Sequence, residues 1–212
     1  MIGSADISFA NHDLIVSGQL LQRSLKKILS HSIGGASIVP EVAEASASFL
    51  SSTQWKVATV SGASDKFPAS LSPYLSQALS SVPRADEHLC AVLDALETIL
   101  PHASWMKREA KLGQDDSFVE RHRHAIITGA GGVFESSTLT LGLALMAPFT
   151  CYPYHHHPPA EFYLVLSQGE WYREGSDWWS PGAGGVVFNP PSYIHAMRSM
   201  DVPLLALWGL FH

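Results

Sequence analysis

Charge, and positive charge above all, is scarce in this sequence of 212 residues. Charged residues make up 15% of the chain, against about a quarter in a typical soluble domain, while 46% of the residues are hydrophobic. This balance excludes a largely disordered chain. Thirteen Lys and Arg residues stand against nineteen Asp and Glu residues, which gives a net charge of −6. No basic patch is visible, so we expect no binding to nucleic acid or to an anionic membrane.

Cysteine and long apolar runs are also scarce. Cys90 and Cys151 lie far apart and form neither a CxxC motif nor a disulfide framework, so we expect free, buried thiols in a reducing compartment. No stretch approaches the roughly 18 apolar residues of a membrane span. The N-terminus shows no basic segment followed by an apolar run of signal-peptide length. We therefore expect a cytoplasmic protein without a membrane span.

The first half of the chain is rich in Ala, Ser and Leu and predicts helices. Apolar residues recur at helical intervals from about Leu14 to Ile33. The strongest helical pattern runs from Pro83 to Leu100, and Pro40 to Ser52 predicts a further helix. The stretch from Ser61 to Pro73 is rich in Ser and Pro and predicts a loop.

After Asp115 the hydrophobic period changes to that of strands. Thr138 to Met146 alternates, with four leucines on one face. Shorter candidates are His124 to Thr128, Phe162 to Leu166, Val186 to Phe188 and Leu204 to Trp208. Many short strands at this spacing favour an antiparallel sandwich or barrel. We predict an α-helical N-terminal extension over 1–115 and a β-barrel over 116–212. The helices either pack on the outside of the barrel or form a dimer contact, so a homodimer is possible.

Histidine is abundant, with 11 residues, and three of them are consecutive. Imidazole is the commonest metal ligand in proteins. Side chains alternate along an extended strand, so His155 and His157 point to one face and His156 points to the other. Two prolines then form a turn, after which Glu161 and Tyr163 share a face. This pattern delivers two imidazoles, a carboxylate and a phenol to one pocket.

A further donor comes from later in the chain. His195 follows a Pro-rich turn, and a neighbouring strand would bring it beside the first group. We therefore predict one divalent transition metal ion held by His155, His157, Glu161 and His195. Iron(II), zinc, manganese, cobalt and nickel all suit three imidazoles and one carboxylate. His122 and His124, at the start of a strand, are expected to be exposed rather than to be ligands.

The donor spacing resembles the first motif of the cupin family, G-x5-H-x-H-x3,4-E-x6-G. His155, His157 and Glu161 match it, Phe149 stands at the leading glycine, and Gly169 falls one residue late. The resemblance implies a mainly β fold, the cupin double-stranded β-helix or jelly-roll barrel, with the helices as an N-terminal extension.

The second cupin motif, G-x5-P-x-G-x2-H-x3-N, is also present. Gly184, Pro190 and His195 match it in spacing, whereas Ser192 replaces the internal glycine and Ser199 replaces the asparagine. The metal-binding positions are intact, and the departures fall at turns.

Further sequence features resemble one cupin family in particular, the cupin-type dimethylsulfoniopropionate (DMSP) lyases of marine bacteria. They are Tyr152 before the histidines, Tyr163 two residues after Glu161, the pair Trp178-Trp179, and the run NPP-x3-HAMRS. The similarity covers roughly Ser117 to Phe211. It implies a metal-dependent carbon–sulfur lyase that splits DMSP, a small zwitterion, into dimethyl sulfide and acrylate by β-elimination.

This reaction needs a base and a site for the sulfonium cation. A free phenol has a pKa near ~10, and a metal cation at bonding distance lowers it. We therefore expect Tyr163 to be the base, with Tyr152 as the second candidate. Aromatic faces suit a sulfonium, and we expect Trp178 and Tyr154 to bind it.

Two other interpretations stay open. An iron(II) cupin dioxygenase acting on a small thiol or acid would use the same donors, although a tyrosine beside the glutamate favours proton abstraction. A non-catalytic cupin module would use the metal for structure or for ligand binding. A DNA-binding regulator is disfavoured, because the N-terminal helices are not basic.

Overall fold

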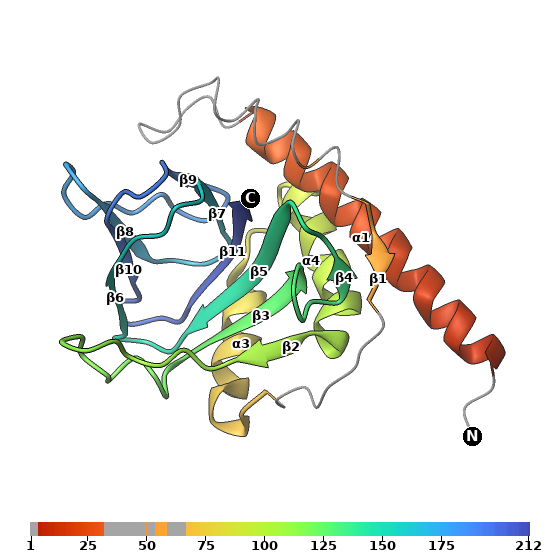
Figure 1. Ribbon diagram of the computed structural model, residues 1–212, viewed down its shortest axis with the longest axis horizontal. Coiled ribbons are helices and arrows are strands. Elements are labelled where there is room, and N and C mark those ends of the chain that lie inside the picture. Colours follow the sequence, from red (N-terminus) through yellow and green to blue (C-terminus); the bar gives the residue numbers. More distant parts are fainter. Residues whose placement is uncertain (1–3, 32–49, 51–53, 59–66) are drawn as a thin grey trace.

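The computed structural model describes residues 4–31, 50, 54–58 and 67–212, and it places a layer of helices against one of two β-sheets (Figure 1). The helices are α1 (Ser4–His31), α3 (Ser72–Ser81) and α4 (Glu87–Ile99), with short 3-10 helices η1 (Ala69–Leu71) and η2 (Leu100–His102).

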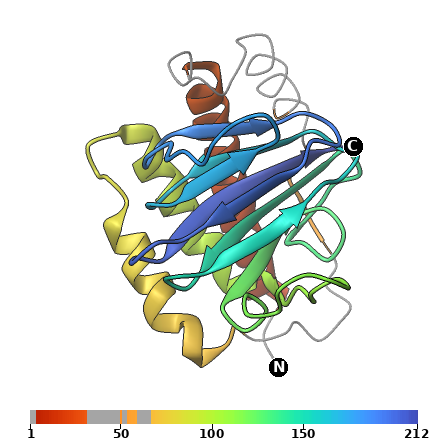
Figure 2. The ribbon, with the colours of Figure 1, turned by 90° about the vertical axis from the view of Figure 1, so that its left-hand side faces the viewer.

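Two sheets form the β part. The larger runs in the order β1 (Lys56–Val57), β4 (Phe134–Glu135), β3 (His122–Thr128), β5 (Leu139–Met146), β11 (Leu204–Phe211), β7 (Glu161–Val165) and β9 (Val186–Asn189), and β2 (Ser104–Met106) pairs with β3. The smaller runs β6 (Cys151–His155), β10 (His195–Arg198) and β8 (Glu170–Arg173). Figure 2 views the molecule from the side of the smaller sheet. Because β1 and β2 join the larger sheet, the first 115 residues contribute strands as well as helices.

The two strongest predicted helices are present, with shifted ends. The first begins at Ser4, ten residues before its expected start. The last begins at Glu87 rather than at Pro83, because the Asp86 carboxylate accepts hydrogen bonds from the backbone N–H groups of His88 (2.8 Å) and Leu89 (3.0 Å). Such an N-cap satisfies amide groups that a new helix leaves without partners.

The expected loop over 61–73 is wrong in its last five residues, which form η1 and the first turn of α3. Pro73 is at the start of α3, where its missing N–H group costs no helical hydrogen bond. Residues 61–66, and most of the helix expected over 40–52, lie outside the described residues.

The predicted strands are present, and β5 shows why their sequences are so apolar. Its four alternating leucines face the helices, while Ala144 and Met146 face the smaller sheet. At Gly142 a Cβ would lie 2.4 Å from the Trp208 ring, so only glycine leaves room for this indole. A strand covered on both faces carries apolar residues in both registers.

The N-terminal helices pack on the outside of the β part. Leucines of α1 and α4 and the outer face of the larger sheet form one continuous core, and α1 packs along α4 (Figure 1). The homodimer stays a prediction. None of the described helices is long and apolar enough to cross a bilayer. Cys90 and Cys151 are free thiols, half-buried and exposed respectively, so the expectation that both are buried is wrong.

Candidate metal centre

Three histidines meet between the two sheets. His155 ends β6 and pairs in register with His195 at the start of β10, and their ring centroids are 4.1 Å apart. His157 follows β6, with its ring 4.9 Å from that of His195. One ring nitrogen from each of the three histidines lies within 4.8 Å of the others.

Glu161 approaches the same point from the larger sheet. Its side chain is buried, and its Oε2 lies 3.0 Å from His195 Nε2 and 3.5 Å from His157 Nε2. Asn189, opposite Glu161 in the β7–β9 pairing, donates a hydrogen bond of 3.0 Å to the same carboxylate. The structure therefore brings together all four residues that the sequence suggested as ligands.

The imidazoles are oriented by the backbone. Each Nδ1 lies near a carbonyl oxygen two residues away: Pro153 for His155 (2.9 Å), Pro159 for His157 (2.9 Å) and Tyr193 for His195 (2.8 Å). Donation from Nδ1–H to these oxygens leaves the Nε2 lone pair free to bind a metal. The Nε2 atoms of His157 and His195 are buried and have no hydrogen-bond partner.

The electrostatics of the cluster suit a bound cation. Burial and the neighbouring His195 lower the pKa of His155 to about 3, so this imidazole is neutral at pH 7. Burial opposes ionisation of Glu161, but the close approach of the His157 and His195 imidazoles outweighs it and holds the pKa of Glu161 below its usual value. Imidazole lone pairs that face a carboxylate in a buried place are the donor set of a divalent transition metal ion.

The two departures from the cupin motifs at glycine positions keep a glycine-like backbone. Phe149 (φ 54°) and Ser192 (φ 64°) are the non-glycine residues with positive φ in the described part of the chain. The Ser192 N–H donates to the His157 carbonyl oxygen at 2.9 Å, so this turn holds the segment that carries the candidate ligand His157. A left-handed conformation costs an L-residue about 1–2 kcal/mol, which is small beside a metal-binding free energy.

Two tyrosines lie beside the cluster and are buried. Tyr163 follows Glu161 on the same face of β7; burial and then the Glu161 charge raise its pKa well above the usual value. Burial raises the pKa of Tyr152 to about 12, and its ring lies 4.9 Å from that of His155. Without a nearby cation, both phenols are therefore protonated at neutral pH.

A β-bulge brings Tyr152 inside. Along β10 the step from His195 to Met197 covers two residues, whereas their partners on β6, His155 and Tyr152, are three residues apart. The extra residue reverses the alternation, so Tyr152 and His155 face the same interior. Simple alternation would have placed them on opposite faces.

Tyr154 and Trp178 are not brought to the histidines. They pack with Tyr172 on the outer surface of the smaller sheet, where Tyr154 is 51% exposed and Arg198 lies 4.3 Å over the Trp178 ring. His156, as expected from alternation, is exposed.

The observed positions of His122 and His124 differ from those expected from the sequence. They were expected at the surface, but His122 is fully buried and His124 is half-buried on the inner face of β3. Their rings are 4.2 Å apart, and the ring of His122 lies 4.8 Å from that of Tyr152. The expectation failed because the smaller sheet covers this face. Asn189 was also missed; its position opposite Glu161 depends on strand pairing.

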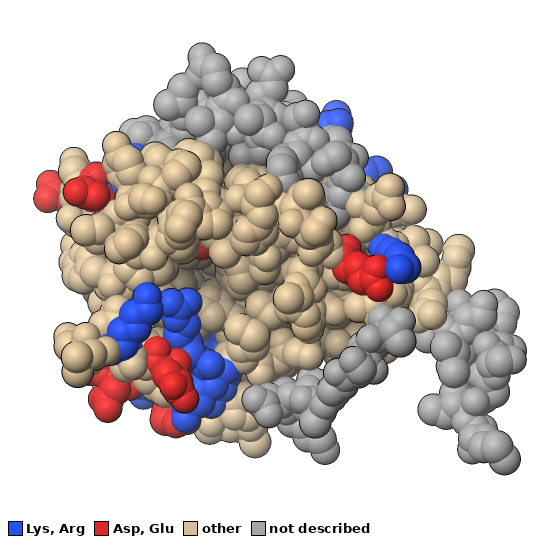
Figure 3. Space-filling view, viewed as in Figure 1, with Lys and Arg blue, Asp and Glu red and all other residues tan. Residues whose placement is uncertain are grey.

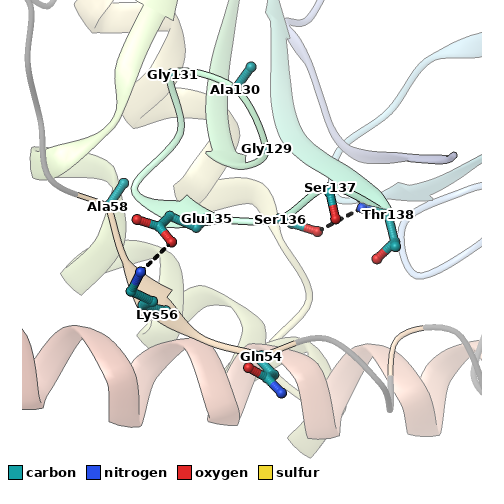
Figure 4. Close-up of a pocket in the computed structure, with 10 residues that line it drawn as sticks. All are labelled: Gln54, Lys56, Ala58, Gly129, Ala130, Gly131, Glu135, Ser136, Ser137 and Thr138. Atoms are coloured by element: carbon teal, nitrogen blue, oxygen red, sulfur yellow. Dashed lines mark hydrogen bonds and ion pairs between the residues drawn. The ribbon is translucent and has the colours of Figure 1, made fainter.

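A separate hollow of about 690 Å³ lies beside β1 and β4, and no histidine lines it (Figure 4). Its charged lining residues, Lys56 and Glu135, pair with each other at 2.7 Å. Serine, threonine and glycine backbone dominate the rest of the lining. This hollow shows no donor group comparable to the histidine cluster.

Comparison with known proteins gives one family. The family model for dimethylsulfoniopropionate lyase matches residues 43–206. Dimethylsulfoniopropionate lyase DddQ of Ruegeria pomeroyi is 33% identical over 120 residues, which cover 55% of this chain and 59% of that protein. The match thus spans less than two thirds of the relative's length.

Solved structures show the same fold. The crystal structure of DMSP lyase DddQ from Ruegeria pomeroyi DSS-3 superposes with a TM-score of 0.64, 22% identity and coverage of 92% of this chain and 91% of that chain. A structure from a study of the DMSP lyases RdDddP and RnDddQII superposes with a TM-score of 0.65 and 18% identity, and the match covers 93% of each chain. The fold is a cupin barrel with N-terminal helices.

Proposed function

Because this chain belongs to the dimethylsulfoniopropionate lyase family, we propose that it cleaves DMSP into dimethyl sulfide and acrylate by base-initiated β-elimination. The convergence of three imidazoles and the Glu161 carboxylate beside two buried tyrosines carries this proposal. Such a site combines a place for a Lewis acid with a place for a base.

The residues present fit a divalent transition metal ion. His155, His157, His195 and Glu161 would hold it, and it would supply Lewis-acid stabilisation of the charge that develops on the substrate carboxylate. Iron(II), zinc, manganese, cobalt and nickel all remain candidates. Asn189 fixes the carboxylate of Glu161, and three backbone carbonyls fix the imidazoles.

Tyr163 is proposed as the base. Its ionised oxygen takes a proton from the substrate carbon next to the carboxylate. The electron pair of that C–H bond becomes the new C=C bond, and the C–S bond breaks with its electrons moving to sulfur. The proton rests on Tyr163 before passing to solvent. Since burial raises the pKa of Tyr163, the residue is a base only when a cation is held beside it.

The interior between the sheets is apolar around these groups. Val165, Trp171 and Met197 are buried there beside Tyr163, and the ring centroids of Trp171 and Tyr163 lie 6.1 Å apart. Water exclusion strengthens every electrostatic interaction in the site. We propose that these interior rings, rather than Tyr154 and Trp178, face the sulfonium.

The test is direct measurement of product. Protein loaded in turn with each of the five metals is incubated with DMSP, and headspace dimethyl sulfide and acrylate are quantified, with chelated protein as the control. Equal amounts of both products that depend on the metal support the proposal. Absence of product with every metal contradicts it. Oxygen consumption with a small thiol would then indicate a dioxygenase, and binding without turnover would indicate a ligand-binding module.

We also propose that the protein is cytoplasmic and that it forms a homodimer. Cell fractionation checks the first. Light scattering at micromolar concentration checks the second.

A further inference from the structure

Arg108 lies in the connection between β2 and β3, residues 107–121, which passes the end of the smaller sheet (Figure 1). Its guanidinium lies 5.9 Å from the centroid of the buried Tyr152 ring. Arg108 makes no hydrogen bond or ion pair with any residue that the structure describes. A half-buried guanidinium with five donors and no protein acceptor is available to a ligand that supplies one.

The connection is held in place, so the position of Arg108 is defined. Lys107 pairs with Glu120, and Gln114 Nε2 donates to the Tyr154 carbonyl oxygen at 3.2 Å. Phe118 is fully buried, with its ring 5.2 Å from that of Tyr152. Charged side chains on this face of the molecule gather mainly over the same region, at the lower left of Figure 3, while most of the face is uncharged.

Unpartnered polar atoms lie close to the Tyr152 ring as well. Both ring nitrogens of His122 and Nδ1 of His124 are buried without a hydrogen-bond partner. Buried polar groups in folded proteins are normally satisfied, so atoms left over beside a candidate active site indicate an absent ligand or water. The rings of His122 and His124 lie 4.8 Å and 5.9 Å from that of Tyr152, the same ring that Arg108 approaches.

We propose that Arg108 binds the carboxylate of the substrate, beside neutral N–H donors from His122 and His124. The inference rests on the proposed function and adds a substrate-binding group to it. Arg108 would also set the direction of the zwitterion. Its positive charge attracts the carboxylate and repels the sulfonium, which leaves the cation to the rings of Trp171 and Tyr163.

The guanidinium is suited to this role because its planar fork matches the two oxygens of a carboxylate. The alternative is a purely structural cation–π contact that supports the Tyr152 ring. The two roles differ in one respect. Loss of a carboxylate partner affects carboxylate ligands alone, whereas loss of support for Tyr152 affects every ligand of the site.

The test uses two halves of the substrate as probes on the metal-loaded protein. 4-Methylpentanoate keeps the carboxylate and replaces the sulfonium by a neutral group, and dimethyl(propyl)sulfonium keeps only the cation. Arg108→Gln is compared with wild type by titration calorimetry, at equal metal content and equal unfolding temperature. Lys107→Gln is the matched control, since Lys107 lies in the same connection and pairs with Glu120.

We expect Arg108→Gln to lower the affinity for 4-methylpentanoate about tenfold or more, which is the scale of one hydrogen bond to a charged group. The affinity for the sulfonium probe should change by less than about twofold. Arg108→Lys restores part of the affinity, because lysine keeps the charge but not the fork. In the lyase assay, KM for DMSP rises more than kcat falls.

Equal weakening of both probes, an unchanged affinity for 4-methylpentanoate, or no binding of that probe by wild type would overturn the proposal. If Arg108→Gln does not fold, Arg108→Lys is used in its place, and the affinity for the carboxylate probe is again compared with that for the sulfonium probe. The enzyme does not cleave either probe, so probe binding can be measured even if the protein has no lyase activity. If wild type shows no lyase activity but Arg108→Gln still loses affinity for the carboxylate probe, the proposed function is contradicted and the carboxylate site is supported.

Discussion

The larger sheet has two buried faces, and only one of them carries polar side chains among its apolar residues. Toward the helices its strands present mainly Leu, Ile, Val, Ala and Phe, which form one core with α1, α3 and α4. Toward the smaller sheet the same strands present apolar residues together with His122, His124, Glu161, Tyr163 and Asn189.

Within β3 the contrast lies between adjacent residues, because Ala125 and Ile127 face the helices and His124 faces the site. Burying a polar group without a partner costs free energy. The burial of apolar side chains on the other face therefore offsets the cost of burying these polar groups. Stability and chemistry are thus assigned to opposite faces of the same strands, and substitutions can separate them.

Tyr163→Phe gives the largest expected effect on the polar face. Loss of the base should lower dimethyl sulfide formation about 10²–10⁴-fold, the usual contribution of a general base, while metal content and unfolding temperature stay the same. Headspace assays of protein with measured metal content check this. Tyr152→Phe is the matched control. If Tyr152→Phe abolishes turnover and Tyr163→Phe retains it, the roles of the two tyrosines are reversed.

Leu143→Ala makes the corresponding change on the apolar face. Leu143 is fully buried against the helices, so the free energy of unfolding should fall by about 2–5 kcal/mol, while activity per folded molecule is unchanged. Urea denaturation and lyase assays on the same preparation measure both quantities. A loss of metal affinity in folded protein would show that the two faces are coupled.

Acid should destabilise the metal-free protein through the polar face. The folded-state pKa values of His124 and His155 are lowered to about 3, mainly by burial, whereas an unfolded histidine titrates near ~6.5. Below that pH the histidines of the unfolded chain bind protons and those of the folded chain do not. The free energy of unfolding therefore falls as the pH is lowered from about 6.5 toward 3. Between pH 7 and pH 5 we expect a loss of about 1–2 kcal/mol for each histidine.

Denaturation curves at pH 7 and pH 5 measure this loss, and His124→Gln should reduce it. The lowered pKa of Glu161 does not contribute in this window, because its stabilising effect is lost only below the usual range of carboxyl groups. An identical pH dependence in the His124→Gln variant would contradict the assignment.

Asn189→Ala should give the smallest of these effects. Removing the hydrogen bond to Glu161 leaves the ligand less well oriented, and such partners typically contribute about 10–100-fold in metal affinity. Competition against a chelator of known affinity measures the change. Ser167→Ala serves as the control, since Ser167 is buried but bonds to Pro203 and Leu205 away from the ligands. Equal affinities for the two variants would argue against the role of Asn189.

Much of this molecule was predictable from local pattern. The helical and strand periods of the sequence located α1, α4 and most strands of the larger sheet. The spacing of His155, His157, Glu161 and His195 identified side chains that the structure brings together at the candidate metal centre. The helix α3 was missed because serines and a proline obscure its apolar period. Its burial against the sheet compensates for weak local preference.

By itself, the sequence determined the classes of element and the set of candidate metal ligands, because alternation and helical period are properties of neighbouring residues. The tertiary structure decided which faces are covered and where alternation breaks. The pairing of β6 with β10 turns Tyr152 inward through a bulge, and the smaller sheet buries His122. The connection from β2 to β3 brings Arg108 to the site. Each depends on contacts between residues far apart in the chain, which no local pattern encodes.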